Sequence, residues 1–371
     1  MRSTRRWTQA GLDPLAQGMA RAVRLAVVRE RRAAGQAGLA AHPQEEAPGA
    51  LVPALEAARA YAAASRSPAT RRAYFAAWQA FTSWCSGPDA PPDDPAPPGA
   101  LPLPAAPAVV AAYAAHLAQL GRRPSSIAQA MAAISVAHQA AGHPSPTRTA
   151  EVRAVLSGIR RAHGAQGAAA RGKAALETPA LRAALASLPQ GTLRGRRDRA
   201  MLLLGFAGGL RRSELAALDA EDLELVPEGL EVTLRRSKTD QEGRGRLVGI
   251  PYGLHEQTCP VRAVQAWQEA ADIASGPLFL TVDRAGRLLQ QRCSERAVAR
   301  AVQRAVRASG GEPGRYGAHS LRSGFVTSAA RAGAPTWAIQ LQTGHRSLAQ
   351  LHEYVRPATL FQENAARYAG L

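Results

Sequence analysis

The stretch LEVTLRRSKTDQEGRGRLVGIP, residues 230–251, interrupts a chain whose other patterns are almost all helical. Its two ends alternate apolar and polar residues, which is the period of a half-buried β-strand. The charged, glycine-containing middle is typical of the connection between two strands. DLELV, residues 222–226, alternates in the same way just upstream. The three runs together predict one small antiparallel sheet in a mainly α-helical protein.

The same stretch holds Lys238, in a chain with 46 lysines and arginines of which only Lys173 and Lys238 are lysine. A GC-rich coding bias explains the preference for arginine in general. The two side chains differ in acidity, because lysine releases a proton near pH ~10 whereas arginine effectively never does. Position 238 is therefore a candidate proton donor. Chance survival, as at Lys173, is the alternative.

Length and charge restrict the class of protein. A chain of 371 residues is long enough for about two domains. Its net charge of +18 indicates a polyanionic partner, most often nucleic acid, although arginine-rich helix faces on an ordinary soluble protein are the alternative. The three cysteines are far apart and form no CxxC pair, which argues against a disulfide framework or a zinc ribbon. No apolar run is long enough to span a membrane, and no signal peptide is recognisable. We expect a cytoplasmic protein with no metal, no cofactor and no membrane partner.

Changes of composition divide the chain into four parts. Residues 1–50 form a basic extension, which is either a loose tail or an added DNA-contacting arm. Residues 51–165 show helical patterns throughout, and residues 166–176 are small and aperiodic, as in a linker. Residues 177–371 begin with helical runs, of which LRRSELAALDAEDL is one, continue with the predicted sheet and return to helices from residue 252 to the end. The fold class is therefore an all-helical first domain followed by a mixed α+β domain.

The helices of the first domain carry recognisable signals. In SPATRRAYFAAWQAFTSWC, Ser67 is a helix cap with Pro68 at the first helical position. Tyr74, Trp78 and Phe81 recur at helical spacing and predict the buried face of that helix. Three further helices follow a proline-rich loop, and the last of them, TAEVRAVLSGIRRAHG, carries arginines on its polar face.

Five short stretches combine residue types that carry chemistry. Each has an ordinary explanation by itself, such as a surface arginine, an ion pair within one helix or a glycine that ends a helix. Their order along the chain is what makes them notable. The stretches are GGLRRSEL (208–215), RSKTD (236–240), HSLR (319–322), TGH (343–345) and HEYVRP (352–357).

In this order and spacing the chain resembles the tyrosine recombinases, the phage-type, Cre-like integrases. The resemblance extends over about residues 55–365, since the helices after residue 67 look like the core-binding domain of that family. It leaves the first 50 residues outside. The positions that match the family's active site are Arg211, Glu214, Lys238, His319, Arg322, His345 and Tyr354.

The resemblance implies a role for three of these residues in proton and bond transfer. Tyr354 would attack a DNA phosphate, form a 3′-phosphotyrosine and free a 5′-hydroxyl. His319 would accept the phenol proton, because a phenol with a pKa near ~10 is a poor nucleophile at neutral pH. Lys238 would protonate the 5′-oxygen, which is a poor leaving group without a general acid.

The other matching residues would hold the phosphate. Arg211 and Arg322 would grip its non-bridging oxygens, since a guanidinium fork matches two phosphate oxygens at once. His345 would donate a further hydrogen bond there, and Glu214 would support Arg211 from the same helix.

The implied function is a site-specific recombinase that cleaves and rejoins double-stranded DNA as a homotetramer, without ATP or metal, in the cytoplasm at the nucleoid. Two alternatives stay open. A type IB-like topoisomerase would use the same chemistry as a monomer, and a non-catalytic DNA-binding protein would keep only the fold. The DNA target is not readable, because too many arginines are available for base contacts.

Overall fold

A computed structural model describes residues 65–87, 100–165, 173–235 and 245–360, with three isolated positions beyond them. The basic extension over residues 1–50 and the hairpin tip with Lys238 lie outside the described residues. The chain divides into two compact units, residues 1–170 and residues 171–371. Each unit has a hydrophobic core of its own.

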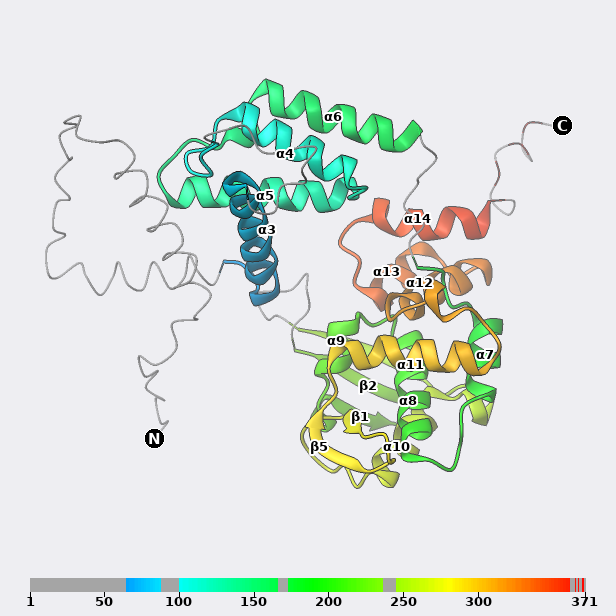
Figure 1. Cartoon of the computed structure of the whole chain (residues 1–371). Helices are drawn as coiled ribbons and strands as arrows, with labels where there is room; N and C mark the ends of the chain where they lie inside the picture. The colour runs from blue at the N-terminus through cyan, green and yellow to red at the C-terminus, as the bar shows by residue number, and fades with distance from the viewer. Residues whose placement is uncertain are drawn as a thin grey trace, which may run out of the picture. The chain divides into compact units, whose positions relative to one another are not determined.

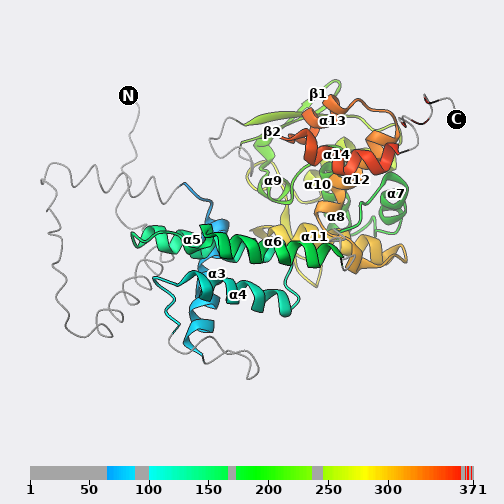
Figure 2. The ribbon, with the colours of Figure 1, turned by 90° about the horizontal axis from the view of Figure 1, so that it is seen from above.

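The first unit is entirely helical over its described residues. Its elements are α3 (Pro68–Ser86), α4 (Pro107–Gln119), α5 (Pro124–Ala140), the 3-10 turn η2 (Pro146–Arg148) and α6 (Ala150–Ala165). The predicted start of α3 is confirmed: the Ser67 hydroxyl accepts a hydrogen bond from the backbone N–H of Thr70 at 3.2 Å, with Pro68 directly after the cap. Trp78 and Phe81 are buried in the core as their spacing predicts, whereas Tyr74 is only partly buried. Helix α3 packs across α5, as Figures 1 and 2 show.

One buried polar side chain joins a loop of this unit to its core. The Nε2 atom of His138, on α5, accepts a hydrogen bond from the backbone N–H of Ala105 at 2.8 Å. Nδ1 must then carry the ring proton, and it donates to the carbonyl of Ile134 at 2.8 Å. Burial lowers the pKa of His138, and the neighbouring carbonyl of Ile134 opposes the shift. His138 is therefore a neutral structural side chain.

The second unit contains helices and two small sheets. Its helices are α7 (Thr178–Ala186), α8 (Leu193–Ala207), α9 (Arg212–Ala217), α10 (Pro260–Ala270), α11 (Glu295–Ala308), α12 (His319–Arg331), α13 (Thr336–Thr343) and α14 (Leu348–Thr359), with short 3-10 turns η3 (Ala220–Asp222), η4 (Glu256–Thr258) and η5 (Pro313–Arg315) between them. Helix α8 is central, because α10, α11 and α12 all pack on it. The last three helices, drawn in orange and red, lie together at one end of the unit (Figure 1). Because α12 packs on α8, this end brings residues from the first and second halves of the unit together.

The predicted sheet is confirmed. Strands β1 (Leu223–Val226), β2 (Gly229–Leu234) and β3 (Arg246–Pro251) pair antiparallel in the order β1-β2-β3. The register pairs Leu230 with Ile250 and Val232 with Val248, and all four side chains are buried. It also pairs Leu234 with Arg246, so the connection that contains Lys238 leaves the ladder beside Arg246.

Two expectations for the second unit are wrong. We expected only helices after residue 251, but β4 (Leu280–Val282) and β5 (Leu288–Arg292) form a second antiparallel pair. The carboxylate of Asp283 accepts the backbone N–H of Arg287 at 2.9 Å and fixes the turn between them. We also expected one helix over LRRSELAALDAEDL, but α9 ends at Ala217. A new cap follows it, because the carboxylate of Asp222 accepts the backbone N–H of Asp219.

Within the described ranges, the longest helices are too short or too polar to cross a membrane.

Candidate active site

Tyr354 and His319 meet at the end of the second unit where α12 and α14 pack together. The Nε2 atom of His319, the first residue of α12, lies 3.0 Å from the Tyr354 hydroxyl. Helix α14 is held in place by Leu351, which is fully buried in a small cluster with Val326 and Ile339 of α12 and α13. The predicted nucleophile and the predicted proton acceptor are thus in hydrogen-bond contact.

Arg322 lies one helical turn after His319 and is the most deeply buried cation of the site, with 2% of its surface exposed. Its Nη1 atom donates to the carbonyl oxygens of Gly209 and Thr343, at 2.6 Å each. Its Nη2 atom is buried but has no hydrogen-bond partner among the described residues. Burial, followed by the charge of Arg211, lowers the pKa of Arg322 to about 10. A buried nitrogen that donates no hydrogen bond lowers the stability of the folded protein, which indicates that this nitrogen is an anion-binding group.

Gly209, in the GGLRRSEL stretch, allows this contact. It has a φ of 54°, in the left-handed region. A Cβ atom added there would lie 2.7 Å from the methyl group of Thr343, closer than side-chain carbons approach. Glycine therefore lets the loop before α9 reach Thr343 and present its carbonyl to Arg322.

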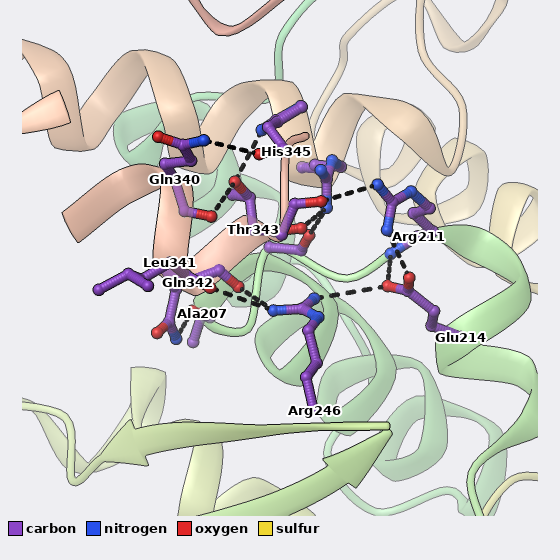
Figure 3. Close-up of polar contacts among 12 residues, drawn as sticks. Ala207, Arg211, Glu214, Arg246, Gln340, Leu341, Gln342, Thr343 and His345 are labelled. Carbon is purple, nitrogen blue, oxygen red and sulfur yellow. Dashed lines mark hydrogen bonds and ion pairs between the residues drawn. The ribbon is translucent and has the colours of Figure 1, made fainter. Parts of the chain in front are cut away.

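Arg211 and Glu214 form the ion pair that their spacing predicts. Nη1 of Arg211 donates to Oε1 of Glu214 at 2.7 Å, and the Arg211 backbone N–H donates to Oε2 at 2.8 Å (Figure 3). The Glu214 side chain is completely buried. Nη2 of Arg211 donates to the carbonyl of Gly344 at 3.1 Å. The buried carboxylate fixes the orientation of the guanidinium.

Arg246 also belongs to this cluster, and the sequence patterns did not reveal it. It is the first residue of β3, and its Nη1 atom donates to the carbonyl oxygens of Leu341 and Gln342, at 3.3 and 2.8 Å (Figure 3). Its Nη2 atom lies 3.7 Å from Glu214. Burial lowers the pKa of Arg246, while Glu214 opposes that shift. One more arginine carried no signal in a chain so rich in them.

His345 is placed by the turn that ends α13. Gly344, as its position predicts, ends the helix in the left-handed conformation, with φ of 64°. The side chain of Gln340 donates to the His345 carbonyl at 2.9 Å, and the Nδ1 atom of His345 lies 2.7 Å from the Thr343 hydroxyl (Figure 3). Burial, and then the charges of Arg322 and other site cations, lowers the pKa of His345 to about 4.

The site as described is strongly positive. It holds the three guanidinium groups of Arg211, Arg246 and Arg322 against the single carboxylate of Glu214. The pKa of His319 is lowered by partial desolvation and then by Arg322 and Arg211, although the residue is exposed at the surface. Such a cluster suits a phosphate group. In the described part of the chain, His, Cys, Asp and Glu form no group of three or more that could hold a metal ion. Lys238 lies outside the described residues.

The relatives found by sequence comparison are named as integrases or recombinases. The sequence model of the phage integrase family matches residues 177–360. An integrase/recombinase XerD homolog of Selenomonas ruminantium is 34% identical over 304 residues, which cover 81% of this chain and 85% of the relative. The chain belongs to the tyrosine recombinase family. A tyrosine recombinase XerD of Xanthomonas campestris pv. campestris is 33% identical, and that match spans 48% of this chain and 54% of the relative. The protein is accordingly a site-specific DNA recombinase.

Solved structures of lower sequence identity share the fold of the recombinase. A lambda integrase dimer bound to a COC′ core site has a TM-score of 0.53 at 19% identity, covering 81% of this chain and 93% of that one. The Tn1549 transposon integrase in complex with transposon right end DNA has a TM-score of 0.51 at 15% identity, covering 92% and 99%. Both comparisons support the mainly helical architecture with small antiparallel sheets.

Proposed function

We propose that the recombinase cleaves and rejoins double-stranded DNA through a 3′-phosphotyrosine at Tyr354, and exchanges strands between two sites without ATP or metal. The observation that carries this proposal is the 3.0 Å contact between the Tyr354 hydroxyl and His319, beside the unsatisfied buried nitrogen of Arg322. A nucleophile, a base and an anion-binding group thus occur together.

The proposed cleavage step exchanges one phosphate ester for another. The Tyr354 oxygen forms a bond to phosphorus while the bond from phosphorus to the 5′-oxygen breaks. The phenol proton passes to Nε2 of His319, whose lowered pKa keeps it neutral and able to accept at pH 7. Lys238 gives a proton to the departing 5′-oxygen.

The proposed phosphate grip uses the positive cluster. Arg322 offers its unpaired Nη2 atom to one non-bridging oxygen, and Arg211, oriented by Glu214, reaches the other. His345 donates a further hydrogen bond. Negative charge gathers on these oxygens in the five-coordinate transition state, and removing one such donor typically costs about 10²–10³ in rate. The arginines neutralise this charge, and the tyrosyl ester retains the bond energy for rejoining, so the scheme requires neither metal nor ATP.

We assign the two units complementary roles. Residues 51–165 are the core-binding domain, residues 177–371 the catalytic domain and residues 166–176 the linker, so that the recombinase surrounds duplex DNA. The two solved structures of similar fold are complexes with a COC′ core site and with transposon right end DNA. Strand exchange between two sites, each cut on both strands, requires four tyrosines, which supports a homotetramer. Near the end of the sequence the apolar residues Leu360, Phe361, Ala365 and Tyr368 are suited to contacts between protomers, and all of them except Leu360 lie outside the described residues.

The test is a covalent adduct between protein and DNA. The recombinase is incubated with supercoiled plasmid that carries the DNA flanking its gene, then denatured, and protein-linked DNA is measured. We expect an adduct with the native protein and none with Tyr354→Phe, which lacks only the hydroxyl. Tyr252→Phe is the matched control, since Tyr252 is an exposed tyrosine directly after β3. An adduct with Tyr354→Phe would assign the nucleophile to another residue. Absence of any adduct with the native protein would favour a non-catalytic DNA-binding protein.

A further inference from the structure

The Thr343 hydroxyl has two close polar neighbours, and it has one proton to share with them. Its Oγ1 atom lies 2.7 Å from the carbonyl oxygen of Ile339 and 2.7 Å from Nδ1 of His345. The side chain is fully buried, so water does not compete for either contact. Which neighbour receives the hydroxyl proton determines which nitrogen of His345 is protonated.

The carbonyl neighbour decides the direction. A carbonyl oxygen has no proton, so a 2.7 Å contact between it and Oγ1 is attractive only if the hydroxyl donates to it. The Thr343 hydroxyl is then an acceptor toward His345, and Nδ1 must carry the ring proton. Neutral His345 therefore has a bare Nε2 atom, which is an acceptor. A phosphate oxygen is also an acceptor, so this form of His345 has no proton to donate to DNA.

We propose that Thr343 is a positioning residue that holds His345 in the Nδ1-protonated tautomer, so that His345 donates to the scissile phosphate only after it has taken up a proton. The inference rests on the proposed role of His345 at that phosphate. In the imidazolium, Nδ1–H stays on Thr343 and Nε2–H becomes a charged donor.

The surroundings of His345 explain why proton uptake and DNA binding are coupled. The groups that face it are Arg322 and His319 of α12, Arg211 before α9 and Arg246 of β3. Without DNA, burial and these charges disfavour the imidazolium, and the pKa is about 4. A bound phosphate offsets their positive charge and accepts from Nε2, and both effects raise the pKa. His345 thus takes up a proton when the phosphate binds.

The tautomer is measured on the free full-length protein, labelled with ¹⁵N at histidine. His345 is one of nine histidines, and its ring signals are those lost in His345→Gln. At neutral pH we expect a proton on Nδ1 in the native protein and in Thr343→Ser, which keeps the hydroxyl. In Thr343→Val, which keeps the shape and loses the hydroxyl, we expect the proton to move to Nε2. A native His345 protonated at Nε2, or an unchanged tautomer in Thr343→Val, would overturn the proposal.

The proton uptake is measured by the pH dependence of adduct formation on plasmid. The ratio of the native rate to the Thr343→Val rate cancels the titration of the other groups. We expect this ratio to fall toward high pH by up to about tenfold per pH unit, because only the native His345 needs an added proton. A ratio independent of pH would refute the uptake step. If no variant forms an adduct although the tautomers are as expected, the proposed function fails and the role of Thr343 in setting the tautomer stands.

Discussion

At the scale of single residues, Lys238 differs from an arginine at the same position because lysine can release a proton. A general acid must release its proton, and lysine does so at a pKa near ~10.4, whereas arginine stays charged. The site already holds three arginines, so a further fixed charge would add little that is new. Proton transfer to the 5′-oxygen is a step of the proposed reaction that an arginine at position 238 cannot perform.

We predict that Lys238→Arg retains DNA binding and loses cleavage by about 10²–10⁴-fold. A substrate with sulfur in place of the bridging 5′-oxygen has a leaving group that needs no proton. On that substrate, Lys238→Arg and Lys238→Ala should cleave almost as fast as the native protein. Arg211→Ala, which weakens the phosphate grip, should remain slow on both substrates. If sulfur restores none of the rate lost in the lysine variants, Lys238 holds the phosphate and another group is the acid.

His138 gives a residue-scale prediction about stability. Its folded pKa is lowered by burial below the usual value near ~6.5, so the unfolded chain binds a proton first as pH falls. Its contribution to the free energy of unfolding is therefore complete above pH ~6.5 and is lost as pH falls from there through the lowered pKa. His138→Gln keeps an acceptor and cannot titrate. Between about pH 7.5 and about pH 5, the urea midpoint should fall less for His138→Gln than for the native protein. Equal falls would show that His138 does not contribute.

At the scale of elements, the position of α14 depends on few apolar contacts. The cluster that holds α14 consists of Val326, Ala330, Ile339 and Leu351, with Tyr354 packed against it. It is separate from the main core of the unit. The distance between Tyr354 and His319 therefore depends on the packing of a small satellite cluster.

We predict that Leu351→Ala lowers stability by about 2–5 kcal/mol, the usual cost of a buried leucine. The loosened helix should also lower the rate of adduct formation on plasmid under conditions where the variant remains folded. Leu348→Ala is the matched control on the same helix, because Leu348 is 49% exposed. That control should change the stability by less than about 0.5 kcal/mol. Native adduct rates in folded Leu351→Ala would show that α14 is positioned by other contacts.

At the scale of the whole molecule, charge and division into units act together. The chain carries a net charge of +18, and each unit has its own hydrophobic core. Each can therefore contribute phosphate contacts independently. Binding that releases counterions weakens with salt in proportion to the number of phosphates neutralised.

We predict that the full chain binds duplex DNA more tightly than residues 171–371 alone, and with a steeper salt dependence. The logarithmic slope should differ by about −0.9 for each phosphate that the first unit contacts. The measurement is binding to one duplex over a series of salt concentrations, with circular dichroism to confirm that the shorter chain is folded. Equal affinities and equal slopes would contradict the proposal that both units surround the DNA.

The sequence by itself determined the features that are local along the chain. The Ser67 cap, the buried stripe of α3, the three strands and the glycine end of α13 each follow from neighbouring residues, because capping and periodicity act over a few positions. The ion pair between Arg211 and Glu214 is local in the same sense. The remaining site residues were predictable only from the resemblance to the tyrosine recombinases, which depends on the order of all five short stretches along the chain.

Only the tertiary structure decided how these local pieces meet. The contact between Arg322 and Gly209 joins residues 113 positions apart, and no local pattern encodes it. The alternation of residues in β3 does not predict that Arg246 contacts the end of α13. The helical period of α13 likewise does not predict the contact between the Thr343 hydroxyl and His345. The second sheet pairs β4 with β5, and beside the local cap the carbonyl oxygens of Ala216 and Leu218 at the end of α9 accept hydrogen bonds from Arg292 of β5. The physical reason is that propensity is a weak local preference, which burial and hydrogen bonding between distant segments override.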